Sequence, residues 1–286
     1  MDQAVKASRL APRPAVSLEE LEQHALALRR HVVRMVARRG LGYLLQGLGA
    51  ADVFTALYFA ELRLDPADTS WADRDRFILS TAHNTAVFYA TLAQRGLIPA
   101  SALDEYLTDG SPFEVNASER IGPLVEATCG SLGQGLSVGM GMALGLRLRG
   151  RDSRVFVLLG DGELQEGQVW EAAMSAAGHR LGNLCLIIDR NEMQVEGHTD
   201  QVVPMEPIAD KWMAFGWRTL TVDGNSLPEV LSALATARAT RDRPTCIVAR
   251  TITGKGVPFL EGRKSHVAAL SRDEAECALA ILGAPR

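Results

Sequence analysis

Residues 154–191 read RVFVLLGDGELQEGQVWEAAMSAAGHRLGNLCLIIDRN, and this stretch decides the fold. It holds two apolar runs, 155–159 and 184–188, and each run stops at polar or glycine-rich residues. A stretch with the composition of a helix, 165–179, separates the two runs. Apolar runs that alternate with helices are typical of buried parallel strands. The stretch therefore predicts a strand–helix–strand unit of an α/β protein.

The same alternation extends in both directions along the chain. RDRFILST (74–81) and PTCIVARTITGKG (244–256) predict further strands, and HNTAVFYATLAQRG (83–96) predicts a helix after the first of them. We therefore expect an α/β fold with a doubly wound, mostly parallel sheet flanked by helices. No internal repeat or linker interrupts it, so we expect one domain over residues 17–286.

The segments before the first predicted strand are helical or loose. Ser17 and Glu20 form a capping-box pattern that opens an amphipathic helix, and Gly40 ends that helix. We expect a glycine-rich loop over 40–49, a second helix over 50–62, and a helix of small residues within 130–150. Residues 1–16 lack the apolar core of a signal peptide, and we expect them to form a flexible N-terminal arm.

Composition excludes several classes of function. The net charge of -4 and the pI near 5.9 provide no overall basic field, so we expect neither nucleic acid nor membrane as a partner. No apolar run approaches the roughly 20 residues that cross a bilayer. The four cysteines are dispersed without a CxxC pair, which argues against disulfides and zinc and favours a cytoplasmic location: Cys129, Cys185, Cys246 and Cys277.

The candidate site follows from the ends of the predicted strands, because ligands of open parallel sheets bind beyond their carboxyl ends. Gly160-Asp161-Gly162 comes after one strand and before a helix, whose N-terminus offers N–H groups to an anion such as a diphosphate. Asp161 supplies an oxygen ligand for Mg²⁺ or Ca²⁺, and Asn191 supplies another at the end of the next strand. Asp-Gly alone is a common turn, so the prediction depends on the spacing of 30 residues between Asp161 and Asn191.

This spacing resembles the signature of thiamine-diphosphate enzymes, and the residues around it are similar to the transketolase family in particular. Four other segments match that family in order: DRFILSTAH, VEATCGSLGQGLSVGMGMALG, PIADKWMAFGW and TGKGVPF. The resemblance covers residues 25–270 and implies a thiamine-diphosphate-binding domain of the diphosphate side.

The resemblance also implies roles for matching positions. The metal, Mg²⁺ or Ca²⁺, would be held by Asp161, Asn191 and the main-chain carbonyl of Met193. The catalytic residues would be His83, His266 and Glu166, with Glu166 in a carboxylate network at a subunit interface. The remaining cofactor contacts would come from Gly160 and Gly162 at the diphosphate and from Gly130 and Leu132 near the thiazolium ring. We expect the other histidines to be packing or surface residues: His24, His31, His179 and His198.

The same resemblance implies a partner. In the family, a glutamate of a second, pyrimidine-binding domain activates the cofactor, and this chain ends about twenty residues after His266. We therefore expect the N-terminal subunit of a split transketolase, active with a C-terminal, pyrimidine-binding subunit in an assembly with two copies of each chain. The substrates would be a ketose or keto donor and an aldehyde acceptor.

The sequence departs from the family pattern at three places. Tyr43 stands where the family has a histidine, FEVNA (113–117) replaces a Gly-His-Pro segment, and Ser265-His266-Val267 replaces Trp-His-Gly. The lost histidines contact sugar hydroxyls or the reacting carbon in the family, so the substrate is open. Two alternatives remain: a thiamine-dependent acyl-transfer or decarboxylating component that uses a 2-oxo acid, and a non-catalytic cofactor-binding paralogue.

Overall fold

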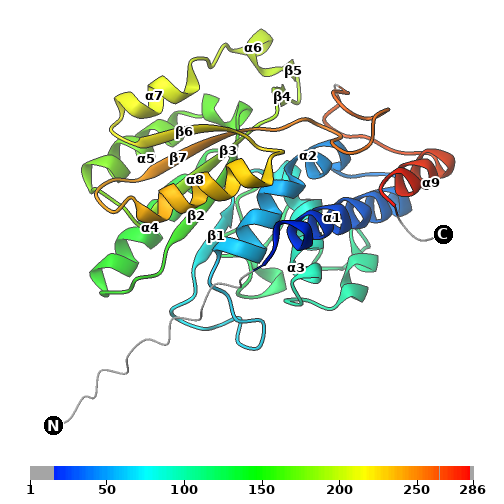
Figure 1. The fold of residues 1–286 in the computed structure, drawn as a ribbon, viewed down its shortest axis with the longest axis horizontal. Helices are drawn as coiled ribbons and strands as arrows, with labels where there is room; N and C mark the ends of the chain where they lie inside the picture. Colours follow the sequence, from blue (N-terminus) through cyan, green and yellow to red (C-terminus); the bar gives the residue numbers. More distant parts are fainter. Residues whose placement is uncertain (1–15, 264, 284–286) are drawn as a thin grey trace.

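The computed structural model describes residues 16–263 and 265–283. The arm expected over residues 1–16 lies almost wholly outside this range. Within it, no helix is long and apolar enough to cross a membrane. The architecture is a five-stranded parallel sheet with helices on both faces, in the order β1-β2-β3-β7-β6 (Figure 1). The predicted fold class is therefore confirmed.

The central strands are the predicted apolar runs. β2 and β3 pair in parallel, with Gly160 opposite Asp189 at their carboxyl ends, and β3 pairs with β7. Every residue of β2 and β3 is buried, which explains why they read as continuous apolar runs. The strands are β1 (Arg76–Leu79), β2 (Val155–Gly160), β3 (Leu184–Arg190), β6 (Arg218–Asp223) and β7 (Thr245–Arg250).

Alternate side chains of these strands enter two different cores. Phe156, Leu158 and Ile187 face the helices of one side, whereas Val157 and Ile188 face those of the other. The first core packs against α1 (Leu18–Arg39), α2 (Leu44–Thr55), α3 (Thr85–Gln94) and α8 (Leu227–Ala239). The second packs against α4 (Gln134–Leu148), α5 (Gly167–Gly178) and α7 (Ile208–Ala214). α9 (Arg272–Ile281) lies beside α1 (Figure 1).

Two predictions about local structure had different outcomes. The capping box at Ser17 and Glu20 is formed, and Gly40 ends α1 with a left-handed backbone, as expected. The loop expected over 40–49 was wrong in its second half, because α2 begins at Leu44. Gly49 lies inside this helix because its backbone approaches the loop after β7: a Cβ there would be 2.7 Å from the carbonyl oxygen of Ile252. The helix continues as a π-helical segment over Ala56–Glu61.

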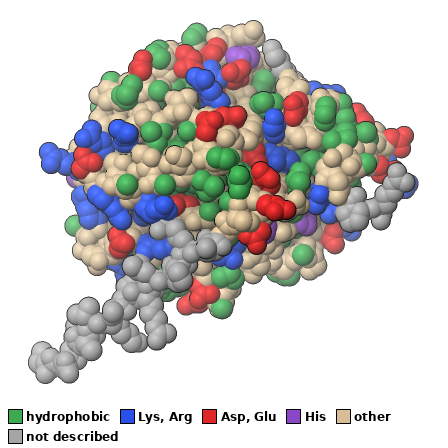
Figure 2. Space-filling model, in the orientation of Figure 1, with side chains coloured by type: hydrophobic (Ala, Val, Ile, Leu, Met, Phe, Trp, Pro, Cys, Tyr) green, Lys and Arg blue, Asp and Glu red, His purple; other side chains and the backbone are tan. Residues whose placement is uncertain are grey.

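Short elements complete the chain and the surface. A small hairpin, β4 (Met193–Gln194) and β5 (Gly197–His198), and the helix α6 (Thr199–Val202) follow β3. Figure 2 shows both acidic and basic side chains on the visible face, with several Lys and Arg side chains gathered toward its left edge.

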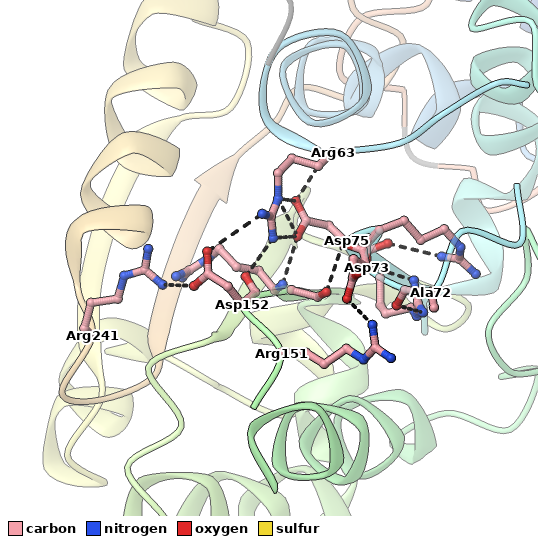
Figure 3. Close-up of polar contacts among 11 residues, drawn as sticks. Arg63, Ala72, Asp73, Asp75, Arg151, Asp152 and Arg241 are labelled. Carbon is pink, nitrogen blue, oxygen red and sulfur yellow. Dashed lines mark hydrogen bonds and ion pairs between the residues drawn. The ribbon is translucent and has the colours of Figure 1, made fainter. Parts of the chain in front are cut away.

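A buried ion pair between Arg63 and Asp75 lies at the amino ends of β1 and β2. Asp75 has a fully buried side chain that accepts hydrogen bonds from the guanidinium of Arg63 at 2.9 Å and from the main-chain N–H of Arg154 at 2.9 Å. Arg63 also donates to the carbonyl oxygen of Asp152 (Figure 3). This cluster lies at the opposite end of the sheet from the strand ends predicted to form the site.

We expect Asp75→Ala to lower the free energy of unfolding by about 3–5 kcal/mol, because it leaves a buried guanidinium without its carboxylate. Chemical denaturation followed by circular dichroism measures this. Arg241→Ala is the matched control: it removes an exposed ion pair to Asp152 in the same cluster and should cost less than about 1 kcal/mol (Figure 3). Equal losses of unfolding free energy in the two variants would show that the buried ion pair stabilises the fold no more than the exposed one.

Candidate active site

A cavity of about 380 Å³ opens at the carboxyl ends of β1 and β2. Its wall includes segments far apart in the chain, from the start of α2 to the loop before α9. Most of the predicted site residues line it: His83, Gly130, Leu132, Gly160, Gly162, Glu166, Met193 and His266. The fold thus brings these residues together, although their roles stay predictions.

Asp161 lies buried at the end of β2. Its carboxylate accepts hydrogen bonds from the main-chain N–H groups of Gly162, at 2.9 Å, and Glu192, at 2.8 Å. Burial, together with the neighbouring charge of Asp189, raises the pKa of Asp161 to about 7. A cation bound at this carboxylate would remove both penalties.

Asn191 and Met193 follow at the end of β3. The amide oxygen of Asn191 accepts from the N–H of Met193 at 2.9 Å, which folds this segment into a tight turn. Both residues line a second cavity, of about 560 Å³, which adjoins the ends of β6 and β7, and of the two Met193 alone lines the first cavity as well. Within residues 16–263 and 265–283, no three His, Cys, Asp or Glu side chains are placed to hold a metal together. A metal here would depend on one carboxylate, an amide and main-chain oxygens.

The two predicted histidines meet in the cavity wall. The rings of His83 and His266 are 6.0 Å apart, edge to face. His83 follows β1, and its ring lies against Gly160, where a Cβ would be 2.8 Å from the ring carbon Cε1. His266 presents a buried Nδ1 without a hydrogen-bond partner among the described residues, and burial and the nearby His83 lower its pKa.

The residues that replace the family's histidines also face this cavity. Tyr43 contacts His266 with ring centroids 5.3 Å apart, and burial raises the pKa of its hydroxyl. Asn116 lies against Gly130, where a Cβ would be 3.0 Å from its side-chain nitrogen. Both residues line the cavity. The departures from the family pattern therefore coincide with the walls of the candidate site.

Leu132 and Glu166 lie at the edge of the cavity and are exposed, Leu132 by 42%. An exposed leucine and an exposed carboxylate beside a pocket are compatible with contact to another chain, as predicted for Glu166.

Two buried carboxylates of the site were missed by reasoning from the sequence. Glu163 accepts hydrogen bonds from the N–H groups of Gly133 and Gly160 and from the hydroxyl of Ser80, so it joins β1, β2 and the start of α4. Burial raises the pKa of Glu163. Asp189 is 1% exposed and holds His83, Asn84, Asn191 and Thr251. Two features of the sequence could have pointed to these carboxylates. Asp189 directly follows an apolar run, and Glu163 belongs to the glycine turn.

Comparison with known proteins agrees with this geometry. Residues 21–285 match the family model described as transketolase, thiamine diphosphate binding domain. The chain is 37% identical over 264 residues to the 6-deoxy-6-sulfo-D-fructose transketolase subunit SqwG of a Clostridium species, covering 92% of this chain and 96% of that subunit. It is 35% identical to one of the subunits of apulose-4-phosphate transketolase from Phocaeicola vulgatus, covering 86% of this chain and 88% of that relative.

Among solved structures, transketolase from Campylobacter jejuni superposes with a TM-score of 0.88 at 28% identity. The match covers 94% of this chain and 43% of that one, so this chain spans less than half of that longer transketolase. A family match over nearly the whole chain, together with relatives above 30% identity that are covered almost completely, shows the family. The chain belongs to the transketolase family and carries its thiamine-diphosphate-binding domain.

Proposed function

We propose that this chain is the diphosphate- and metal-binding subunit of a two-chain, thiamine-diphosphate-dependent enzyme that transfers a two-carbon ketol unit from a ketose donor to an aldehyde acceptor. The observation that carries the proposal is the cavity that gathers His83, His266 and the glycine turn beside the buried Asp161. Its relatives named as transketolase subunits support the same interpretation.

The residues present fit the cofactor and a divalent metal. The buried Nδ1 of His266 has no hydrogen-bond partner among residues 16–263 and 265–283, and His266 lines the cavity, as expected of a group that a ligand will satisfy. Gly160 and Gly162 leave the wall of the cavity without side chains, and a Cβ at Gly162 would be 3.0 Å from the Cβ of Gln194. The oxygen donors at the strand ends are of the kind that Mg²⁺ and Ca²⁺ prefer.

Each residue then has a specific role. Asp161, the amide oxygen of Asn191 and the carbonyl of Met193 would hold the metal, and Gly160 and Gly162 would let the diphosphate approach the backbone. When bound, the thiazolium ring acts as the electron sink for the two-carbon unit. The ring would lie near Gly130 and Leu132.

The catalytic side chains would act on protons and orientation. His266 is suited to accept a hydrogen bond or a proton at Nδ1, because its lowered pKa keeps the ring neutral near pH 7. His83 would contact the diphosphate or the reacting centre from the opposite wall. Glu166, exposed at the rim, would enter a carboxylate network with another subunit.

The second half of the active site would come from another chain. We infer a C-terminal, pyrimidine-binding partner, because relatives that this chain covers almost completely are named subunits, whereas the longer transketolase is covered by 43%. Two copies of each chain would form the assembly. We place it in the cytoplasm, where free cysteines are the usual state; all four here are free.

Co-expression with that partner tests the proposal. The tagged chain should retain the partner through purification, and the pair should consume a ketose donor only when an aldehyde acceptor, thiamine diphosphate and Mg²⁺ are present. Release of carbon dioxide from 2-oxo acids without ketose cleavage would favour the acyl-transfer or decarboxylating alternative. Cofactor binding without turnover on either donor class would favour the non-catalytic paralogue.

We expect Tyr43→His to shift the donor preference toward ordinary ketose phosphates. A histidine at this position would form a hydrogen bond with a sugar hydroxyl of the donor more readily than tyrosine does. This matters because a buried polar group left without a partner costs about 1–3 kcal/mol. The ratio of kcat/KM for xylulose 5-phosphate to that for the best donor should rise by about tenfold. Tyr43→Phe keeps the ring beside His266 and should not raise this ratio. An unchanged ratio in Tyr43→His would show that position 43 does not set specificity.

A further inference from the structure

Several side chains of the candidate site contact the carboxylate of Asp189. This residue is the last but one of β3, it is 1% exposed, and it receives hydrogen bonds from Asn191 of its own segment and from side chains of two other segments. Its Oδ2 accepts from Asn84 Nδ2 at 2.9 Å and Asn191 Nδ2 at 3.0 Å and lies 3.3 Å from His83 Nε2. The hydroxyl of Thr251, after β7, donates to Oδ1. One side chain therefore links the ends of β1, β3 and β7.

This contact decides which way the amide of Asn191 points. An ionised carboxylate only accepts hydrogen bonds, so the amide must turn its NH₂ group toward Asp189. The oxygen of Asn191 then faces the opposite direction, toward the N–H of Met193. An amide with the reverse orientation would present NH₂ where the metal is expected and could not act as a ligand.

The same contact favours the tautomer of His83 that carries its hydrogen on Nε2, because the carboxylate of Asp189 accepts. With its Nε2–H donated to Asp189, its Nδ1 is the acceptor for the hydroxyl of Thr81, at 2.9 Å. The ring is fixed between two partners, in contact with Gly160. Asp189 thus orients a predicted metal ligand and a predicted catalytic histidine at once.

We propose that Asp189 is a positioning residue that sets the amide oxygen of Asn191 toward the metal and fixes the ring of His83, with no direct contact to the metal itself. This inference rests on the proposed function, because it presupposes the metal site. Groups that orient metal ligands in this way typically contribute 10- to 100-fold in metal affinity.

Two substitutions separate orientation from charge. Asn in place of Asp189 can put its oxygen where Oδ2 stands and donate its NH₂ to the hydroxyl of Thr251, so the amide of Asn191 keeps its orientation. Asp189→Asn should therefore weaken the apparent Mg²⁺ affinity by less than about fivefold, whereas Asp189→Ala should weaken it by about 10- to 100-fold. The measurement is calorimetric titration of Mg²⁺ into the full chain, purified with its partner and supplied with thiamine diphosphate.

Asp75→Ala serves as the matched control, because it destabilises the opposite end of the sheet. It should lower the unfolding temperature and leave the Mg²⁺ affinity at the wild-type value. If general destabilisation caused the loss of affinity in Asp189→Ala, Asp75→Ala would show a similar loss. Equal affinity in Asp189→Ala and wild type would overturn the inference, and so would an equal loss in Asp189→Asn and Asp189→Ala. A wild-type complex that binds no Mg²⁺ would instead reject the metal site of the proposed function, and the inference with it.

Discussion

Asp161→Ala is expected to abolish the metal-dependent binding of thiamine diphosphate. Asp161 is the single carboxylate at the predicted metal site. Without it, only neutral oxygen ligands from the chain would hold the cation that bridges to the diphosphate. Asp161→Asn keeps the shape of the side chain and one of the two acceptor oxygens that the main-chain N–H groups of Gly162 and Glu192 use, and it should weaken the apparent affinity by more than about 100-fold. Isothermal titration of the full chain with thiamine diphosphate and Mg²⁺ measures both losses.

Unfolding does not account for the expected loss. Burial raises the pKa of Asp161 from 3.8 to about 7 in the metal-free chain. An acid whose pKa rises on folding favours the folded state in its protonated form, so its contribution becomes unfavourable as the pH rises from 3.8 toward 7. At pH 8, Asp161→Asn should therefore unfold no earlier than the wild-type chain without metal. Asp210→Asn, the same change at an exposed site on α7, should alter neither property. Wild-type affinity in Asp161→Asn would remove Asp161 from the metal site.

Four of the five strands could be predicted from the sequence, including β1 at one edge of the sheet, whereas β6 at the other edge could not. β2, β3 and β7 are buried and therefore appear as continuous apolar runs. β6 (RTLTVD) was missed because all six of its residues are partly or fully exposed at the edge of the sheet. A rule that looks for apolar runs has no signal there.

The starts of helices could be predicted where the signal is local in the sequence, and not where it depends on distant contacts. The capping box of α1 is a local pattern that involves neighbours in the sequence, and it was found. The start of α2 was not, because its first residues look like a glycine-rich loop. Gly49 is needed there by contact with the loop after β7, about 200 residues away, which local reasoning cannot detect.

The candidate site was predictable as far as strand ends define it. Asp161 and Asn191 could be placed together because neighbouring parallel strands end at the same edge of the sheet. The role of Asp189 could not be derived in the same way, since its partners come from three segments whose approach is a property of the whole fold. Glu163 was overlooked for the same reason: its donors lie on β2, at the start of α4 and after β1.

In the function that we propose, the active site is divided between two chains. This chain supplies the predicted ligands of the metal and the diphosphate, and the glutamate that activates the pyrimidine is expected on the partner. Proton transfer at that ring needs a carboxylate held within hydrogen-bond reach, and general acid–base catalysis contributes about 10²- to 10⁴-fold to a rate. The isolated chain should therefore show no turnover with any ketose or 2-oxo acid donor.

The most direct measurement is the initial rate of ketol transfer by a fixed amount of this chain, titrated with its pyrimidine-binding partner in the presence of saturating thiamine diphosphate and Mg²⁺. We predict no rate without the partner, a rise with each addition, and saturation at one partner per chain. Turnover by the isolated, mass-verified chain at the rate of the mixture would contradict a divided active site.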